Sequence, residues 1–471
     1  MSIEHSSLTA PPLRSAWLVL LVVVVADVMD VVDSTIATLA GPSIRADLGG
    51  ADSTVQWVLT AYTAAFAIGL VTSGRLGDLF GRRRLFLLGM TGFTLASLAC
   101  GLAPGVGFLI AARVLQGLFG SVMIPQGFAM VAFVFPPQEL RKALIPFGPV
   151  MGLATVAGPI AAGWLLHLDL FGAQWRSIFL VNVPIGLAAL PLGLRYLPHR
   201  TGEDRTTRLD LRGVALLTLA SALLIIPLVQ GRELGWPPWT HLSIAGAVAT
   251  LALFVSSERR SPHPVIAPTL FTRRGFVVGL AVVACFYASS SGFQLALTLL
   301  LQLGLHWTPL HTSLTLIPWA LGSAVAVVLA GAVLTRKLGR TTLHLGLGLT
   351  VLGLLALWWT ISAPPTTSTT LAPALLVTGF GTGLVFVPLF DFVLGDATTD
   401  EIGTGSGMLN AVQQFSAAIG VAALGTVFFT SADHATTTYA TELVIALAAT
   451  LCLLTFALVW LLPKHAQRAE A

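Results

Sequence analysis

The chain contains repeated apolar segments, each long enough to cross a lipid bilayer. A membrane-spanning helix needs about 20 mostly apolar residues, because its backbone polar groups must be hydrogen-bonded within the segment. The segments are residues 17–40, 55–73, 85–103, 108–135, 143–167, 178–196, 213–230, 240–256, 276–301, 313–334, 342–361, 371–390, 405–429 and 441–462. These fourteen segments predict an all-helical integral membrane protein.

The composition excludes a soluble globular protein. Of the 471 residues, 55% are hydrophobic and only 10% are charged, whereas about a quarter of the residues in soluble domains are charged. The net charge of +4 therefore gives no reason to expect a nucleic-acid partner. Cys100, Cys285 and Cys452 all lie in apolar segments, so we expect buried free thiols and no disulfide. The ten histidines are scattered, and we expect no metal site.

The positions of the basic residues predict the orientation of the chain, because basic loops stay on the cytoplasmic side of a membrane. With the N-terminus inside, 21 of the 25 Lys and Arg residues fall in cytoplasmic segments, and only Arg45, Arg176 and Arg232 fall in outer loops. An even number of spans then places both termini in the cytoplasm. A missed helix would invert every later loop, so the charge distribution also supports the span count.

A weak internal repeat divides the chain into two halves. Residues 335–340 align with residues 77–82 and keep the glycine and the basic end of that segment. Duplicated bundles are common in transporters, so we expect spans one to six and nine to fourteen to form two six-helix bundles, with spans seven and eight inserted between them. The predicted parts are a cytoplasmic N-terminus (1–16), a first bundle (17–197), a cytoplasmic linker (198–212), an inserted helix pair (213–258), a second bundle (275–462) and a cytoplasmic tail (463–471).

A segment rich in glycine and arginine separates the second and third spans. Its sequence is Gly74-Arg75-Leu76-Gly77-Asp78-Leu79-Phe80-Gly81-Arg82-Arg83-Arg84. We expect the glycines to permit a tight turn between closely packed helix ends. We expect the arginines to hold the loop in the cytoplasm. The segment resembles the signature loop of the major facilitator superfamily. That resemblance implies a cytoplasmic gate made of Gly74, Arg75, Gly77, Asp78, Gly81, Arg82 and Arg83.

Three acids lie within the first predicted span. An ionisable side chain in the membrane core costs about 2.5–3.5 kcal/mol, so Asp27, Asp30 and Asp33 are candidate functional residues. At 100° per residue, their spacing places them within an arc of about 120°. They therefore share a face that must point into the protein or into water. The alternative is that they only border a hydrated crevice or cap the span.

The residues that follow Asp33 extend this interpretation. The segment 33–44, DSTIATLAGPSI, is similar to a first-helix motif of the fourteen-helix drug:proton antiporters of the same superfamily. Asp33 matches the acidic position of the motif and Pro42 matches its closing proline. The resemblance implies a role for Asp33 in proton coupling or substrate binding, with Asp30 and Asp27 as further candidates.

Arg113 is the base that lies well inside a span, at a depth comparable with that of Asp33. The segment 113–120, RVLQGLFG, is similar to the fourth-helix motif of the superfamily, in which the arginine is linked to proton transfer. A guanidinium stays charged at any working pH and favours a nearby ionised carboxylate. We expect a movement that separates Arg113 from Asp33 to let the acid take up a proton. A static structural ion pair is the alternative.

The fifth span combines small residues with a proline. The residues concerned are Gly148, Gly152, Gly158, Pro159 and Gly163. Small residues one turn apart permit close packing of helices, and proline supplies a bend. The arrangement resembles the antiporter motif of the superfamily, which occurs in exporters. The segment 175–186, WRSIFLVNVPIG, is also similar to the entry of the sixth helix in the fourteen-helix branch.

The second half of the chain offers fewer polar candidates. Asp391 lies at the inner end of the twelfth span, and Asn410 and Gln413 lie in the thirteenth. These three side chains form a candidate second-bundle site. A solvated helix end and hydrogen bonds between neighbouring helices are the alternative interpretations.

These features predict a proton-coupled secondary exporter that works by alternating access. The substrate is expected to be a small amphipathic or lipophilic compound, and a cation, because the spans contain aspartates and no lysine. The proton gradient supplies the energy, so no cofactor is expected, and the chain lacks the phosphate-binding Gly-x-x-x-x-Gly-Lys loop. We expect a monomer in a bacterial cytoplasmic membrane. The alternatives are a dedicated exporter of one endogenous metabolite or antibiotic and, in another class, a membrane enzyme or sensor.

Overall fold

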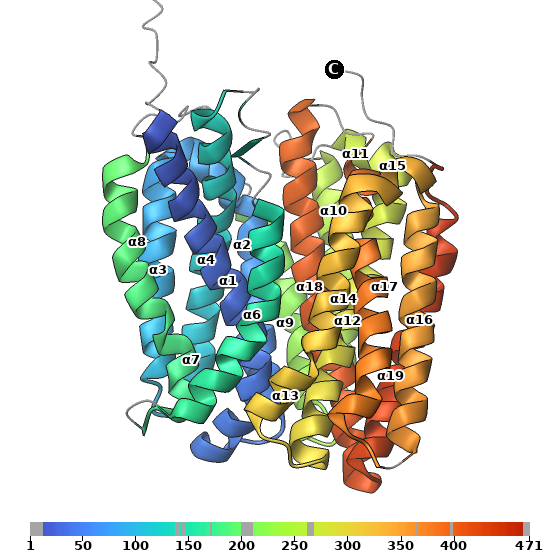
Figure 1. Ribbon diagram of the computed structural model, residues 1–471. Coiled ribbons are helices and arrows are strands. Elements are labelled where there is room, and N and C mark those ends of the chain that lie inside the picture. The colour runs from blue at the N-terminus through green and yellow to red at the C-terminus, as the bar shows by residue number, and fades with distance from the viewer. Residues whose placement is uncertain are drawn as a thin grey trace, which may run out of the picture.

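The computed structural model describes residues 13–136, 139, 142–143, 147–169, 172–198, 211–260, 268–363, 365–395 and 399–464. Within these ranges every regular element is a helix. Figure 1 shows two bundles of nearly parallel helices lying side by side, one built from the first half of the chain and one from the second. The predicted fold class, two helical bundles with an inserted helix pair, is confirmed.

The first bundle is arranged around α1, which packs against α2, α4, α6 and α8. α2 also packs closely on α4, and α4 on α3. The elements of this bundle are α1 (Leu13–Leu48), α2 (Ser53–Phe80), α3 (Arg82–Gly101), α4 (Val106–Val134), α6 (Phe147–Leu168), η2 (Gln174–Arg176), α7 (Ser177–Leu180) and α8 (Asn182–Tyr196).

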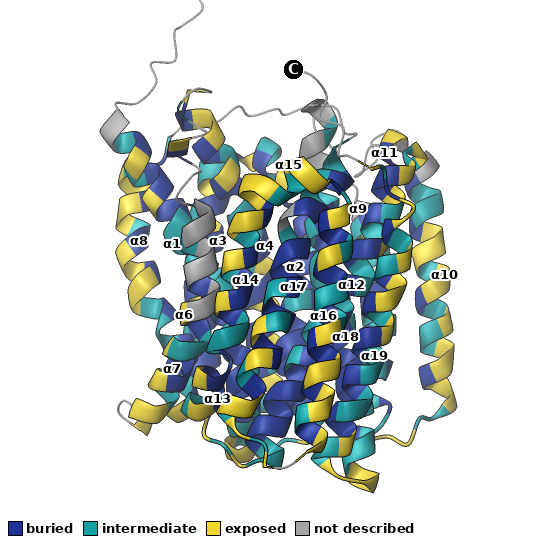
Figure 2. Ribbon diagram, turned by 45° about the vertical axis from the view of Figure 1, so that its right-hand side comes forward, coloured by how far each residue is buried: buried dark blue, intermediate teal, exposed yellow. Residues whose placement is uncertain are grey.

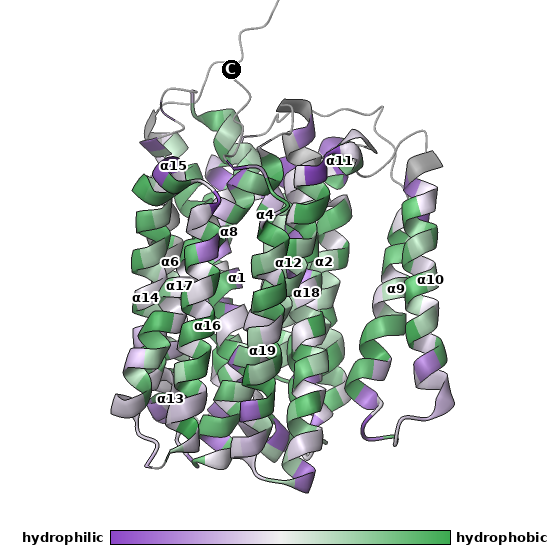
Figure 3. Cartoon of the chain, turned by 90° about the vertical axis from the view of Figure 1, so that its right-hand side faces the viewer, coloured by the Kyte–Doolittle hydropathy of each residue, from purple (hydrophilic) through white to green (hydrophobic). Residues whose placement is uncertain are grey.

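The second bundle is preceded by a pair of helices that stands at the edge of the molecule. Figure 3 shows this pair, α9 (Leu211–Gln230) and α10 (Pro238–Arg260), at the edge of the molecule. The two helices pack against each other, and α9 also contacts α2 and α18. The second bundle consists of α11 (Pro268–Thr272), α12 (Arg274–Leu299), η3 (Leu300–Gly304), α13 (Pro309–Thr315), α14 (Ile317–Leu329), η4 (Ala330–Leu334), α15 (Thr335–Leu338), α16 (Thr341–Ser362), α17 (Ser368–Leu394), α18 (Thr399–His434) and α19 (Thr437–Val459).

The helices are long and apolar enough for a protein that crosses the membrane many times. Thirteen helices of the described chain meet these requirements. α6 occupies the position of the remaining predicted span, and its apolar part within the described residues is Ala157–Leu168. Figure 2 shows exposed residues along the outer helices, including α10, where Leu242 and Val248 are exposed. Apolar side chains on that outer surface suit contact with lipid.

The first helix is longer than the predicted first span. α1 continues through Pro42 as far as Leu48, beyond the predicted end at residue 40. The additional turns carry Asp47, which accepts hydrogen bonds from Trp175 Nε1 at 2.9 Å and from Arg176 Nη1 at 2.6 Å. These bonds to the segment before α7 anchor the end of α1, which explains why the helix outlasts its apolar stretch.

The junction between α2 and α3 is much shorter than the sequence suggested. α2 ends at Phe80 and α3 begins at Arg82, so only Gly81 makes the turn. Its φ of 89° is a backbone conformation that L-residues rarely adopt. Gly74 and Gly77 lie within α2 instead. Gly77 permits close packing, since a Cβ atom there would lie 2.1 Å from Oε1 of Gln126 on α4.

Replacing Gly81 by alanine should lower the stability of the fold. The side chain would have to adopt the strained backbone of this junction, which costs about 1–3 kcal/mol of unfolding free energy. Gly74→Ala is the matched control, because a Cβ atom at Gly74 would have no neighbouring atom within 4 Å and alanine favours a helix by about 0.5–1 kcal/mol. Thermal unfolding in detergent measures both changes. Equal stability of the two variants would contradict the assignment of the turn to Gly81.

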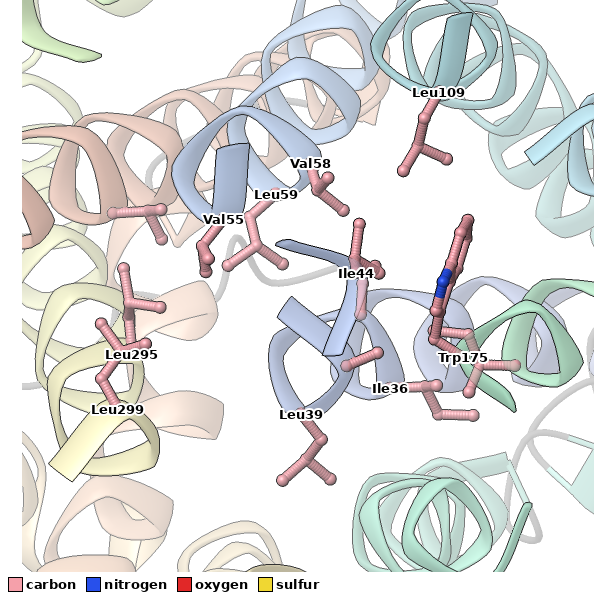
Figure 4. Packing of buried hydrophobic residues seen from close by; sticks show 14 of the residues in the cluster. Ile36, Leu39, Ile44, Val55, Val58, Leu59, Leu109, Trp175, Leu295 and Leu299 are labelled. Carbon is pink, nitrogen blue, oxygen red and sulfur yellow. The ribbon is translucent and has the colours of Figure 1, made fainter. Parts of the chain in front are cut away.

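The two bundles touch at one end of the molecule, here called the hairpin end because it carries the turn between α9 and α10. A cluster of buried apolar residues joins them there, including Leu39, Val55 and Leu59 of the first bundle and Leu295 and Leu299 of the second (Figure 4).

Hydrogen bonds from two glutamine side chains also cross between the bundles at this end. Gln56 Nε2 donates to the carbonyl of Ala422 at 2.8 Å, and Gln302 Nε2 donates to the carbonyl of Leu39 at 3.0 Å. Together with the apolar cluster, these bonds close the hairpin end. The opposite end, which carries Arg75 and Arg82, is called the basic end.

Candidate functional site

A buried ion pair lies inside the first bundle. The carboxylate of Asp33 on α1 accepts hydrogen bonds from Arg113 Nη1, from Gln116 Nε2 at 2.7 Å and from Asn182 Nδ2 at 3.0 Å. The side chains of Asp33 and Arg113 are each only 1% exposed. The pair that the sequence predicted from the two motifs and from the similar depth of the two residues is therefore formed, and α4 and α8 supply two further amide donors to the acid.

Arg113 is held by more than its acid partner. Its Nε donates to the carbonyl of Val58 on α2 at 3.0 Å, and its Nη1 also donates to Gln116 Oε1 at 2.7 Å. The guanidinium lies over the ring of Tyr62, 4.2 Å from the ring centroid, a distance at which a cation is attracted to an aromatic face. The arginine is thus fixed on α2 and α4, while its carboxylate partner comes from α1.

Asp30 lies one turn before Asp33 in a different environment. Its Oδ1 accepts a hydrogen bond from the hydroxyl of Tyr62, and its side chain lines a cavity between the bundles. Tyr62 therefore touches both acid sites, because its ring lies against Arg113 and its hydroxyl binds Asp30.

Asp27 is enclosed in the first bundle. It is 4% exposed, neither of its carboxyl oxygens has a hydrogen-bond partner among the described residues, and it is not part of the cavity lining. The three aspartates share an arc of α1 but have three separate surroundings. All three lie inside the protein or at its cavity: Asp30 faces the cavity, and Asp33 and Asp27 are buried in the bundle.

The cavity has a volume of about 910 Å³ and lies between α1, α2 and α4 of the first bundle and α18 of the second. Arg75, Asp78 and Arg82 line it, which places its mouth at the basic end. Apolar side chains such as Phe66 and Phe128 line other parts of the wall. A cavity of this size suits a drug-sized ligand. Since the hairpin end is closed, the molecule is open at the basic end alone within the described part of the chain.

The second bundle contributes amide side chains to this cavity. Asn410, Gln413 and Gln414 of α18 line it, and Oε1 of Gln413 is buried without a hydrogen-bond partner among the described residues. Asp391, the third member of the candidate second-bundle site, lies on α17 and is not among the lining residues. An acid and a group of amides therefore border the same cavity from opposite bundles.

Four residues of the predicted gate, Gly74, Arg75, Asp78 and Arg82, line the cavity, and the gate segment contacts its own bundle. Asp78 pairs with Arg82 at 3.1 Å, one helical turn away. Arg83 Nη2 donates to the carbonyl of Leu194 on α8 at 2.5 Å. Gln126 Nε2 donates to the carbonyl of Ser73 at 2.6 Å, which holds the end of α2 against α4. These contacts fix the gate segment to the first bundle.

The small residues of α6 permit two different close contacts. A Cβ atom at Gly158 would lie 2.5 Å from Thr35 Oγ1 of α1, within the first bundle. A Cβ atom at Gly163 would lie 2.3 Å from Ser313 Oγ and 2.8 Å from the Cα atom of Leu310, both in α13 of the second bundle. Pro159 is half-buried between them. The surroundings of Gly148 and Gly152 lie outside the described residues.

Three residues of the ion-pair site were not predicted. Gln116 lies one turn after Arg113 and therefore on the same face of α4, a spacing that could have indicated it. Asn182 is a polar residue inside an apolar segment, which is also a usable signal. Tyr62 offered no comparable signal, because its bond to Asp30 depends on how α2 packs against α1.

Comparison with known proteins identifies the family. The model of the Major Facilitator Superfamily matches residues 23–421. A probable actinorhodin transporter of Streptomyces coelicolor is 44% identical over 89% of this chain and 73% of its own length. Multidrug resistance protein Stp of Mycobacterium tuberculosis is 32% identical over 83% of this chain and 72% of its own length.

A solved structure shows the same fold at low sequence identity. The crystal structure of a POT family transporter in complex with 5-aminolevulinic acid superposes with a TM-score of 0.69 over 96% of this chain and 97% of that chain. The two sequences are 12% identical, so the likeness concerns the fold alone.

Proposed function

Because this chain belongs to the Major Facilitator Superfamily and is a transporter rather than an enzyme, we propose that it exports small amphipathic or lipophilic compounds, cations above all, in exchange for protons. The proton gradient is the energy source and no cofactor takes part. The basic end is the cytoplasmic end, with both termini there, in the inner membrane of a bacterium. The protein works as a monomer.

The proposal rests on the contact chain from the cavity to the buried ion pair. Asp30 borders the cavity and binds Tyr62, and Tyr62 lies against Arg113, which pairs with Asp33. A cation that binds Asp30 competes with the hydroxyl of Tyr62 for that carboxylate. A cation bound at Asp30 favours the ionised form of the nearby Asp33, so Asp33 releases its proton and pairs with Arg113. Asp33 takes up a proton again after the substrate has left and the pair has separated, and Tyr62, which contacts both Asp30 and Arg113, links the two events.

The cavity favours substrates that are partly apolar. Phenylalanine side chains supply apolar contact, Asp30 supplies a negative charge, and the amides of α18 supply hydrogen-bonding groups. Because the cavity is open at the basic end, a compound can enter it from the cytoplasm or the inner leaflet. Closing the basic end and opening the hairpin end would then release the compound outside, as in alternating access.

Reconstitution in proteoliposomes tests the proposal. Cationic, neutral and anionic aromatic compounds are offered under an imposed pH gradient, and both compound accumulation and compound-evoked proton release are recorded. We expect gradient-driven accumulation that a protonophore abolishes, strongest for cations. Accumulation that does not depend on the pH gradient would exclude proton coupling, and a preference for anions would exclude Asp30 as the group that binds the substrate.

A dedicated exporter of one antibiotic or metabolite is a second candidate. The relative with 44% identity is named for a single compound, whereas the relative with 32% identity is named for multidrug resistance. In the same assay, a dedicated exporter would accumulate one compound and leave the rest of the panel untouched.

The amide of Gln413 should contribute to substrate affinity. Gln413→Leu removes hydrogen-bonding groups from the cavity wall, and a neutral hydrogen bond contributes about 0.5–1.5 kcal/mol. We therefore expect the KM of transport to rise about twofold to tenfold, with the maximal rate retained. Gln294→Leu is the control, because Gln294 lies in the same bundle but outside the large cavity. An unchanged KM for Gln413→Leu would remove Gln413 from the site.

A further inference from the structure

The turn between α9 and α10 connects the two bundles through one arginine. Arg232 Nη2 contacts Oδ2 of Asp52, which precedes α2 in the first bundle, at 3.1 Å. Arg232 Nε donates to Oδ2 of Asp433, at the end of α18 in the second bundle, at 3.1 Å, and Nη2 contacts the same oxygen. One guanidinium thus binds a carboxylate of the first bundle and a carboxylate of the second bundle at the closed hairpin end.

The surroundings of Arg232 support this position. Its side chain is 16% exposed and lies over the ring of Phe429, 5.5 Å from the centroid. Burial alone would lower the pKa of Arg232, but hydrogen bonds to Asp433 and Asp52 outweigh that effect and raise it. The neighbouring Glu233 accepts a hydrogen bond from the backbone N–H of Ser53, the first residue of α2, at 2.9 Å.

Closer to the middle of the membrane, α9 packs against both bundles where they meet. Ile225 and Val229 of α9 form one apolar cluster with Ala64 of α2 and with Ala418 and Ala422 of α18. A helix that contacts both bundles in this way covers the line along which they meet.

A polar contact accompanies this cluster. Thr426 Oγ1 of α18 donates to the carbonyl of Leu228 on α9 at 2.5 Å, and Gln56 Nε2 of α2 donates to the same Thr426 hydroxyl at 3.2 Å. A hydrogen-bonded chain thus runs from α2 through α18 to α9, independently of Arg232.

We propose that the inserted helix pair is a latch that holds the hairpin end closed, with Arg232 as the residue that joins the two bundles. Separation of α2 from α18 at this end requires Arg232 to release Asp52 or Asp433. The latch therefore stabilises the state that is open at the basic end. This inference concerns the positions of the bundles and does not depend on the substrate or on proton coupling.

Distance measurements between spin labels test the latch. Ala51→Cys and Ala435→Cys place labels on exposed residues at the hairpin ends of the first and second bundles. Cys285 is replaced by serine, because it is the half-buried native cysteine while Cys100 and Cys452 are buried. Double electron–electron resonance in nanodiscs then reports the separation of the bundles without substrate.

We expect a short distance in the parent protein and a longer second population in Arg232→Gln. Partly exposed ion pairs are individually weak, so the ratio of long to short distances should rise about fivefold. Asp433→Asn should give a smaller shift in the same direction, because Arg232 keeps Asp52. Arg232→Lys, which retains one charge, should fall between the parent protein and Arg232→Gln.

The matched control is Arg176→Gln. Arg176 also pairs with an aspartate at the hairpin end, Asp47 at 2.6 Å, but both residues belong to the first bundle. Arg176→Gln should leave the distances between the spin labels unchanged. An equal shift in Arg176→Gln would overturn the latch, because the effect would then follow from any loss of charge at this end. Unchanged distances in both Arg232→Gln and Asp433→Asn would overturn it as well.

Discussion

Asp33→Asn should abolish proton-driven accumulation of substrate. Asparagine has no negative charge, so Arg113 would be left buried without its ionic partner, at 1% exposure. Removing one partner of a buried ion pair typically costs about 3–5 kcal/mol, and the asparagine amide cannot accept and release a proton. We expect substrate to equilibrate downhill at most, with no substrate-evoked proton release. Transport in proteoliposomes measures both quantities.

Two other aspartates of α1 serve as comparisons for Asp33→Asn. Asp47→Asn removes an acid that is also paired with an arginine, but its side chain is 35% exposed, so the expected loss of stability is only about 0.2–1 kcal/mol. Asp30→Asn leaves the buried pair intact and should weaken the binding of cations more than that of neutral compounds. Full coupling in Asp33→Asn would show that another acid carries the proton, and Asp30 would be the first to test.

Gly163→Leu should prevent closure of the hairpin end. Even a Cβ atom at this position would lie 2.8 Å from the Cα atom of Leu310 in the opposite bundle, where the obstacle is backbone and not a flexible side chain. Overpacking costs about 1–3 kcal/mol, which shifts the ratio of closed to open hairpin ends about 5-fold to 150-fold. Substrate loading from the basic end should fall accordingly.

The distance assay and the transport assay together check the Gly163→Leu prediction. Gly348→Leu is the matched control, because a Cβ atom at Gly348 on α16 would have no neighbouring atom within 4 Å. Since the nearest neighbours of a Cβ atom at Gly163 belong to the other bundle, the level of folded protein should remain near that of the parent. Transport by Gly163→Leu at the rate of the parent protein would mean that the bundles close without the close contact between Gly163 and Leu310.

Periodicity, charge and depth predicted much of this molecule. The apolar segments predicted the helices because lipid permits few other structures, and an arginine and an aspartate at equal depth predicted their own pairing because neither is stable alone in an apolar interior. The depth of a residue in the membrane depends on its own helix alone, so it can be counted from the sequence.

The features that the sequence did not predict depend on how helices face one another. Asp27, Asp30 and Asp33 share an arc of α1, but only the packing of α2, α4 and α8 decides which of them borders the cavity. The apolar pattern predicts an end of the first span at residue 40, whereas α1 continues beyond it because Asp47 binds Trp175 and Arg176, which are distant in sequence. The bond from Tyr62 to Asp30 likewise depends on contact between two helices.

The apolar cluster that closes the hairpin end has a thermal consequence. Separation of the bundles would bring side chains such as Leu59 and Leu295 into contact with water. Hydration of apolar surface raises the heat capacity, and the attraction between such surfaces weakens on cooling. We therefore expect the balance between the two orientations of the transporter to follow a curved temperature dependence, with cold favouring the form that is open at the hairpin end.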